Sequence, residues 1–90
     1  MFKIKYTKRE TVIGTYFKCG DLRYKVIEST MYLGEKCYNL SLIDIGKKSG
    51  YIIKAFVRKD VFEERIKNDY YKIVQEYEVP YILQQEKISI

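Results

Sequence analysis

The sequence predicts a β-rich α+β fold: a curled antiparallel sheet, or a small and partly open barrel, of five or six strands with one helix from the C-terminal half packed on it. Three observations lead to this prediction. Short segments that either alternate between apolar and polar residues or are rich in β-branched and aromatic residues run from residue 2 to residue 58. Turn-forming residues separate them, and one long helical pattern of apolar residues follows. The chain has 90 residues, enough for one hydrophobic core, so we expect a single domain over residues 1–90 that folds alone or as a small homo-oligomer.

The first three strands are expected at about residues 2–6, 11–19 and 22–31. A two-residue turn, Gly20-Asp21, separates the last two and fixes their pairing, because glycine supplies the positive φ that such a turn needs. One side of this hairpin is apolar and is expected to face the core. The other side places Lys18 directly opposite Arg23, and a like-charged pair destabilises a sheet by up to about 1 kcal/mol. The hairpin therefore contains two cations that repel each other, and this cost calls for an explanation.

Two further strands are expected at about residues 37–45 and 51–58. A turn at residues 34–35 would place Lys25 opposite Asp44, which favours that register. The same register puts Glu28 opposite Ser41 on the core face, where a buried carboxylate needs a partner, so a β-bulge or a one-residue slip is the alternative. Both strands are apolar on their two faces, which is typical of strands covered on both sides.

A helix is expected at about residues 61–77. Asp60 followed by Glu63 has the spacing of a capping box. The apolar stripe of this helix would consist of Phe62, Ile66, Tyr70, Ile73, Val74 and Tyr77. Pro80 ends the helix, and residues 86–90 could return as a short edge strand.

The residue types argue against catalysis and against a bound metal or other cofactor. The chain has no histidine, which removes the usual general base near neutral pH and a common metal ligand. Cys19 and Cys37 lack the spacing of a zinc or redox site, so we expect reduced, partly buried thiols. No apolar run is long enough to cross a membrane, and residues 1–10 do not resemble a secretion signal. We therefore expect a non-enzymatic cytoplasmic protein with no membrane partner.

Positive charge is concentrated at the start of the chain. Residues 1–25 contain seven Lys or Arg residues against two Asp or Glu residues, which accounts for the whole net charge of +5. The loop at residues 46–50, GKKSG, is expected at the same end of the sheet as the Gly20-Asp21 turn. The candidate binding residues are Tyr16, Lys18, Arg23, Lys25, Lys47 and Lys48. Cations can bind phosphate groups, an aromatic ring can stack on a base, and strands can hold both in place. This combination predicts contact with nucleic acid or a nucleoprotein complex.

The expected helix offers a second hypothesis, a stoichiometric protein–protein inhibitor or adaptor. Its outer face would present acidic residues around a tyrosine, which could dock on a basic surface of a host protein. The residues concerned are Glu64, Asp69, Tyr71 and Glu76. Abundant residue types with AT-rich codons favour an origin in a low-GC bacterium, an archaeon, a phage or another mobile element. A small domain from such an element could act as a stoichiometric modulator of a host nucleic-acid machine. The sequence leaves both hypotheses open.

Overall fold

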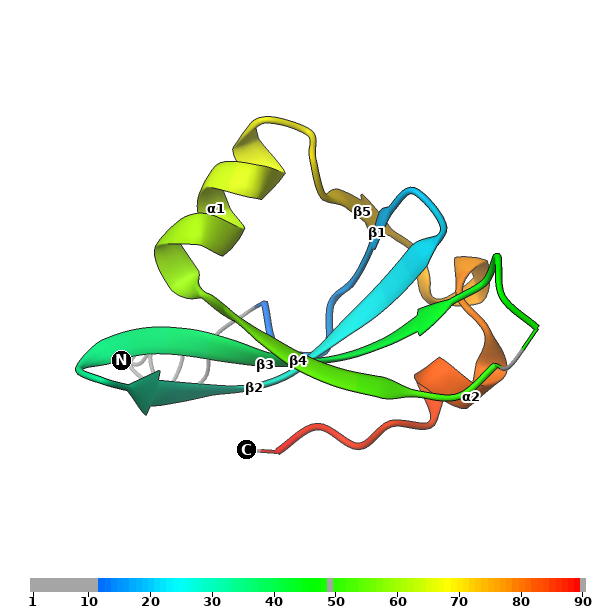
Figure 1. Ribbon diagram of the computed structural model, residues 1–90, viewed down its shortest axis with the longest axis horizontal. Coiled ribbons are helices and arrows are strands. Elements are labelled where there is room, and N and C mark those ends of the chain that lie inside the picture. Colours follow the sequence, from blue (N-terminus) through cyan, green and yellow to red (C-terminus); the bar gives the residue numbers. More distant parts are fainter. Residues whose placement is uncertain (1–11, 49, 90) are drawn as a thin grey trace, which may run out of the picture.

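The structure, a computed structural model, describes residues 12–48 and 50–89 (Figure 1). A five-stranded antiparallel sheet has the order β4-β3-β2-β1-β5, and its strands are β1 (Tyr16–Cys19), β2 (Leu22–Tyr32), β3 (Glu35–Asp44), β4 (Ile53–Arg58) and β5 (Lys72–Val74). The helices are α1 (Lys59–Lys67), the 3-10 turn η2 (Glu76–Glu78) and α2 (Tyr81–Gln84). In this part of the chain the edge strands β4 and β5 do not meet, so the sheet is open. The predicted β-rich α+β fold is confirmed.

The β1–β2 hairpin has the register that the sequence predicted. Lys18 pairs with Arg23 and Cys19 with Leu22 across the two-residue turn, and Gly20 has a φ of +61°. The strand expected at residues 11–19 is shorter, because residues 12–14 form a turn and β1 begins at Tyr16. The strand expected at residues 2–6 lies outside the described residues.

The register expected between β2 and β3 is wrong. The chain turns at residues 33–34 instead of 34–35, and a register shift of the bulge type follows between Val26 and Glu28. Lys25 therefore lies opposite Ser41 rather than Asp44. The β-bulge was the alternative predicted from the sequence. It also gives Glu28 the partner that its carboxylate needs, because Glu28 Oε2 accepts a hydrogen bond of 2.7 Å from Asn39 Nδ2.

The helix expected at residues 61–77 is also wrong in length and in its cap. The helix α1 has nine residues, its N-cap is Arg58, and Asp60 lies in its first turn, where its carboxylate accepts a hydrogen bond from Arg58. After α1 the chain reverses at Asp69, which has a φ of +62°, and β5 pairs with β1. Pairing with the open edge of β1 satisfies backbone groups there, and this tertiary contact overrides the helical pattern of the sequence.

Residues 86–89 do not form a strand, although one was expected at residues 86–90, of which residue 90 lies outside the described residues. Residues 86–89 have no regular structure, and a single backbone hydrogen bond of 2.9 Å, from Ser89 N to Ile27 O, joins them to the bulge in β2. This segment nevertheless runs along the sheet on the side opposite α1 (Figure 1). Both faces of the sheet are therefore covered.

The two faces have different interiors. The face under α1, here called the helix face, holds an aromatic core in which the rings of Phe17 and Tyr24 stack at a centroid distance of 4.6 Å. The opposite face, here called the C-terminal face, is covered by η2, α2 and the residues that follow. Its buried apolar residues form a smaller cluster of Tyr16, Ile43, Val74, Val79 and Leu83.

Candidate nucleic-acid interface

Three positive side chains lie in one row across the sheet. Lys18 in β1 pairs with Arg23 in β2 on one side and with Lys72 in β5 on the other. Directly opposite residues project to the same face of a sheet, so the three charges share the C-terminal face. The guanidinium of Arg23 donates hydrogen bonds to the carbonyl oxygens of Gly20 (2.7 Å) and Leu22 (3.3 Å), which direct it toward the turn. Within residues 12–48 and 50–89, no carboxylate forms an ion pair with Lys18 or Lys72.

The β3–β4 loop lies beside the β1–β2 turn, as expected from the sequence. The amide of Ile45 donates a hydrogen bond of 2.9 Å to Asp21 O. Gly46 also lies close to this turn, since a Cβ at that position would be 2.5 Å from Oδ2 of the exposed Asp21 side chain. Lys47 and Lys48 follow and are exposed, so they extend the row of charges at this end of the sheet.

Tyr16 and Lys25 do not belong to this surface, and their expected exposure is wrong. Both are buried, with exposed fractions of 9% and 8%. Lys25 Nζ donates hydrogen bonds to Gln84 O (2.9 Å) and Glu86 O (2.5 Å), and it lies 5.4 Å from the centroid of the Tyr16 ring. Burial lowers the pKa of the Lys25 ammonium group. The cause is the C-terminal segment, which returns over this face about sixty residues later in the chain.

The four residues of the alternative interface do not form one surface. Tyr71 is buried in the aromatic core, and its hydroxyl accepts a hydrogen bond of 2.7 Å from Arg65 Nη1. Its expected exposure is wrong because α1 ends before it. Glu64 and Asp69 are exposed around a hollow at the end of α1, whereas Glu76 lies in η2 beside Tyr16. The acidic residues are thus divided between the two sides of the sheet.

Sequence reasoning missed four residues of this region. Lys72 was assigned to the helix, although the run Tyr-Tyr-Lys-Ile-Val at residues 70–74 is rich in the aromatic and β-branched types that strands favour. Ser41, Lys54 and Glu86 carry no local signal, because only the return of the C-terminal segment brings Glu86 to the other two.

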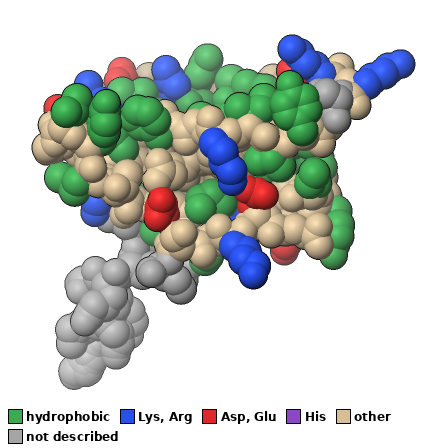
Figure 2. All heavy atoms as spheres, turned by 60° about the horizontal axis from the view of Figure 1, so that its bottom comes forward, with side chains coloured by type: hydrophobic (Ala, Val, Ile, Leu, Met, Phe, Trp, Pro, Cys, Tyr) green, Lys and Arg blue, Asp and Glu red, His purple; other side chains and the backbone are tan. Residues whose placement is uncertain are grey.

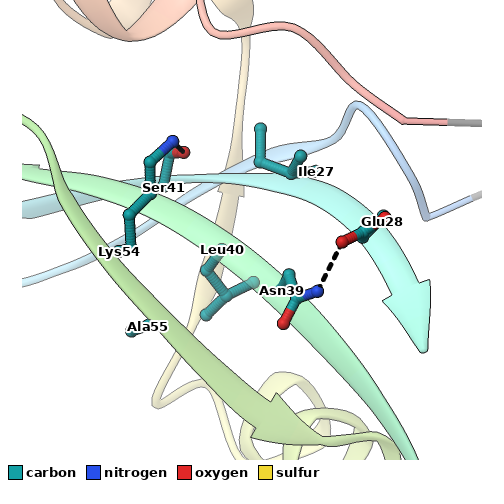
Figure 3. A pocket seen from close by; sticks show the side chains of 7 residues that line it. All are labelled: Ile27, Glu28, Asn39, Leu40, Ser41, Lys54 and Ala55. Atoms are coloured by element: carbon teal, nitrogen blue, oxygen red, sulfur yellow. Dashed lines mark hydrogen bonds between the residues drawn. The ribbon is translucent and has the colours of Figure 1, made fainter. Parts of the chain in front are cut away.

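A small hollow lies on the C-terminal face next to these residues (Figure 3). It has a volume of about 240 Å³, and its lining residues are Ile27, Glu28, Asn39, Leu40, Ser41, Lys54 and Ala55. Ligand pockets usually have about 300–1,000 Å³. The carboxylate and the amide at one side of the hollow are already bonded to each other. The charged end of the sheet is therefore the stronger candidate for a binding site.

Other site types have little support in the described part of the chain. In residues 12–48 and 50–89, no three His, Cys, Asp or Glu side chains are grouped so that they could hold a metal ion. Cys19 and Cys37 are free thiols, of which Cys37 is buried. None of the helices within these residues has the length and apolar character to span a membrane. Comparison with protein-family models, curated proteins and solved structures found no match.

Proposed function

We propose that this protein is a non-enzymatic cytoplasmic regulator that binds nucleic acid, alone or in a nucleoprotein complex, through the basic end of its sheet. The basic end consists of Lys18, Arg23, Lys47, Lys48 and Lys72. The observation that carries the proposal is the row of three cations on neighbouring strands with no carboxylate partner in the described residues. Such a row opposes folding, and phosphate groups would supply the missing negative charge.

The geometry of the basic end suits a phosphate backbone. Three strands hold the row of cations on a fixed platform, and the two loop lysines extend it beyond the edge of the sheet. Tyr51 directly follows the loop and is 61% exposed, so it offers the ring for base stacking that the buried Tyr16 cannot offer. The surface thus combines the cations and the aromatic ring that single-stranded sites use.

The proposal is tested by reversing the central charge with Lys18→Glu. We expect the affinity for labelled single-stranded and duplex oligonucleotides to fall about tenfold. The slope of log affinity against log salt should fall by about 0.7–0.9, because one phosphate contact is lost. Fluorescence anisotropy over a salt series measures both quantities.

Lys59→Glu is the matched control. It changes the net charge equally, but Lys59 begins α1 at the other end of the sheet, next to the last residue of β4. Equal losses in the two variants, or no binding by the unmodified protein, would contradict the proposal.

A protein-binding function is the second proposal, and a different region supports it. The end of the sheet around the β2–β3 turn exposes Met31, Tyr32, Leu33 and Phe56, and Figure 2 shows hydrophobic side chains gathered there, at the left of the view. Leu33 is 84% exposed and has a φ of +51°, a conformation that leucine rarely adopts. An apolar contact with a partner protein would depend little on salt, so the same salt series separates the two proposals.

A further inference from the structure

A polar cluster lies under the C-terminal segment, in the row next to Lys18 and Arg23. Lys25, Ser41 and Lys54 lie side by side across β2, β3 and β4. The Ser41 hydroxyl is fully buried and donates a hydrogen bond of 2.7 Å to the carboxylate of Glu86. The same carboxylate oxygen accepts from Lys54 Nζ, and Lys25 Nζ donates to the backbone carbonyl of Glu86. One acidic residue thus occupies three donors of the sheet.

These donors form an anion site. Lys54 Nζ and Ser41 Oγ contact the Glu86 carboxylate, and Lys25 Nζ donates to the backbone carbonyl of the same residue. The carboxylate of Glu76 also acts on Lys25, so each of the two ammonium groups has a negative charge nearby. A phosphate group accepts charge-assisted hydrogen bonds from the same kinds of donor. Hydrogen bonds from Lys54 and Ser41 lower the pKa of the Glu86 carboxyl, which keeps this internal anion ionised.

The segment that carries Glu86 is weakly attached. Residues 85–89, here called the strap, contain no helix or strand. Besides the contacts of Glu86, the strap has one backbone hydrogen bond to β2 and the packing of Ile88, which is partly buried. The Lys54 side chain is 70% exposed, and water screens an ion pair of that kind. In contrast, Val79 and Leu83 are buried and anchor the residues before the strap. This difference in packing would allow the strap to leave while η2 and α2 stay.

We propose that the strap is an autoinhibitory cover, and that a phosphate of the bound nucleic acid displaces Glu86 and occupies the site of Lys25, Ser41 and Lys54. This inference rests on the function proposed above. The covered row lies two residues along the strands from the row of Lys18 and Arg23, a separation of about 7 Å. Opening of the strap would join the two rows into one basic surface.

The test compares Glu86→Gln with Glu64→Gln, which removes the same charge from the outside of α1. We expect Glu86→Gln to bind a labelled oligonucleotide about fivefold more tightly than the unmodified protein, because the apparent affinity rises with the open fraction. Glu64→Gln should change the affinity less than twofold. Adding Lys54→Met to Glu86→Gln should return the affinity to that of the unmodified protein. Equal effects of Glu86→Gln and Glu64→Gln would overturn the inference.

Hydrogen exchange on the unmodified protein gives a second readout that does not depend on a variant. The amide of Ser89, which is bonded to Ile27 O, should lose protection when oligonucleotide is added. Unchanged or increased protection would overturn the inference even if the oligonucleotide binds through Lys18. If neither the unmodified protein nor Glu86→Gln binds any oligonucleotide, the proposed function fails and the inference falls with it.

Discussion

The two faces of the sheet are covered in different ways. On the helix face the ring of Phe17 contacts those of Tyr24, Phe62 and Tyr71 at centroid distances of 4.6–5.2 Å, and α1 seals this aromatic core. On the C-terminal face a smaller apolar cluster is continued by charged hydrogen bonds to the last residues of the chain. Apolar side chains that leave a core become exposed to water, which is unfavourable. A donor that is bonded to a carboxylate can instead form an equivalent hydrogen bond to another anion. The helix face is thus suited to stabilising the fold, and the C-terminal face is suited to binding an anion.

Two neighbouring residues of β2 show this difference directly. Tyr24 projects into the helix face, where burial raises the pKa of its hydroxyl to about 12. Lys25 projects to the C-terminal face, where burial lowers the pKa of its ammonium group. Both side chains are buried, but the one on the helix face is a neutral phenol and the one on the C-terminal face is a cation. A buried cation that is bonded to two backbone carbonyls is a group that a stronger anion could recruit.

The largest effect is expected from a cavity in the helix face. Phe17→Ala should lower the free energy of unfolding by about 3–5 kcal/mol, because it removes a fully buried ring and leaves a cavity. This is a large share of the stability of a small domain, so the whole fold should be weakened. Urea unfolding followed by circular dichroism measures the loss.

Leu83→Ala is the counterpart on the C-terminal face. Leu83 is also fully buried, but its loss should cost about 2 kcal/mol, at the low end for such a change, because the segment around it can collapse. Hydrogen exchange should show the weakening mainly in residues 76–89. If Leu83→Ala weakens the aromatic core as much as Phe17→Ala does, the two faces are one cooperative unit and the comparison fails.

An intermediate effect is expected from acid. The pKa of Glu86 lies below its usual value of 4.5 when the strap is attached, so attachment is favoured above that value and is lost as the pH falls through the lowered pKa. The aromatic core contains no group that titrates in this range. Amide resonances of Ser41 and Ser89 followed from pH 7 to pH 3 should therefore shift before those of β1 and β2 residues on the helix face. If these resonances shift at or above the usual pKa of a glutamate, the contacts of Glu86 with Lys54 and Ser41 are contradicted.

The sequence predicted those parts of the fold that depend on neighbouring residues. Gly20 and Asp21 specify a two-residue turn, and the turn specifies the register of β1 and β2. The alignment of Lys18 with Arg23 follows from that register alone. The segment at residues 70–74 was misassigned because its apolar spacing fits a helix, while the open edge of β1 selects a strand.

Only those features of the candidate site that depend on neighbouring residues were predicted correctly. The alternation along β2 correctly separated Tyr24 from Lys25, but it could not indicate which face would be covered by a later segment. Lys25 is buried by contacts with residues about sixty positions away, and Lys72 joins the row of cations only because β5 pairs with β1. The composition of residues 70–74 favours a strand, but no local pattern indicates which strand it pairs with or which segment covers Lys25.

The smallest effect is expected at the row of cations, where repulsion between like charges lowers the stability of the fold but the same charges favour binding. Lys18→Thr removes two like-charged pairings from the sheet, with Arg23 and with Lys72, and introduces a residue that strands favour. The free energy of unfolding should rise by a few tenths up to about 1 kcal/mol, while the affinity for oligonucleotides should fall. Lys18→Gln is the control, because it removes the same charge without introducing a residue that strands favour. If Lys18→Gln brings no gain, the effect is one of strand preference, and the row of cations would then impose no stability cost that a bound phosphate could relieve.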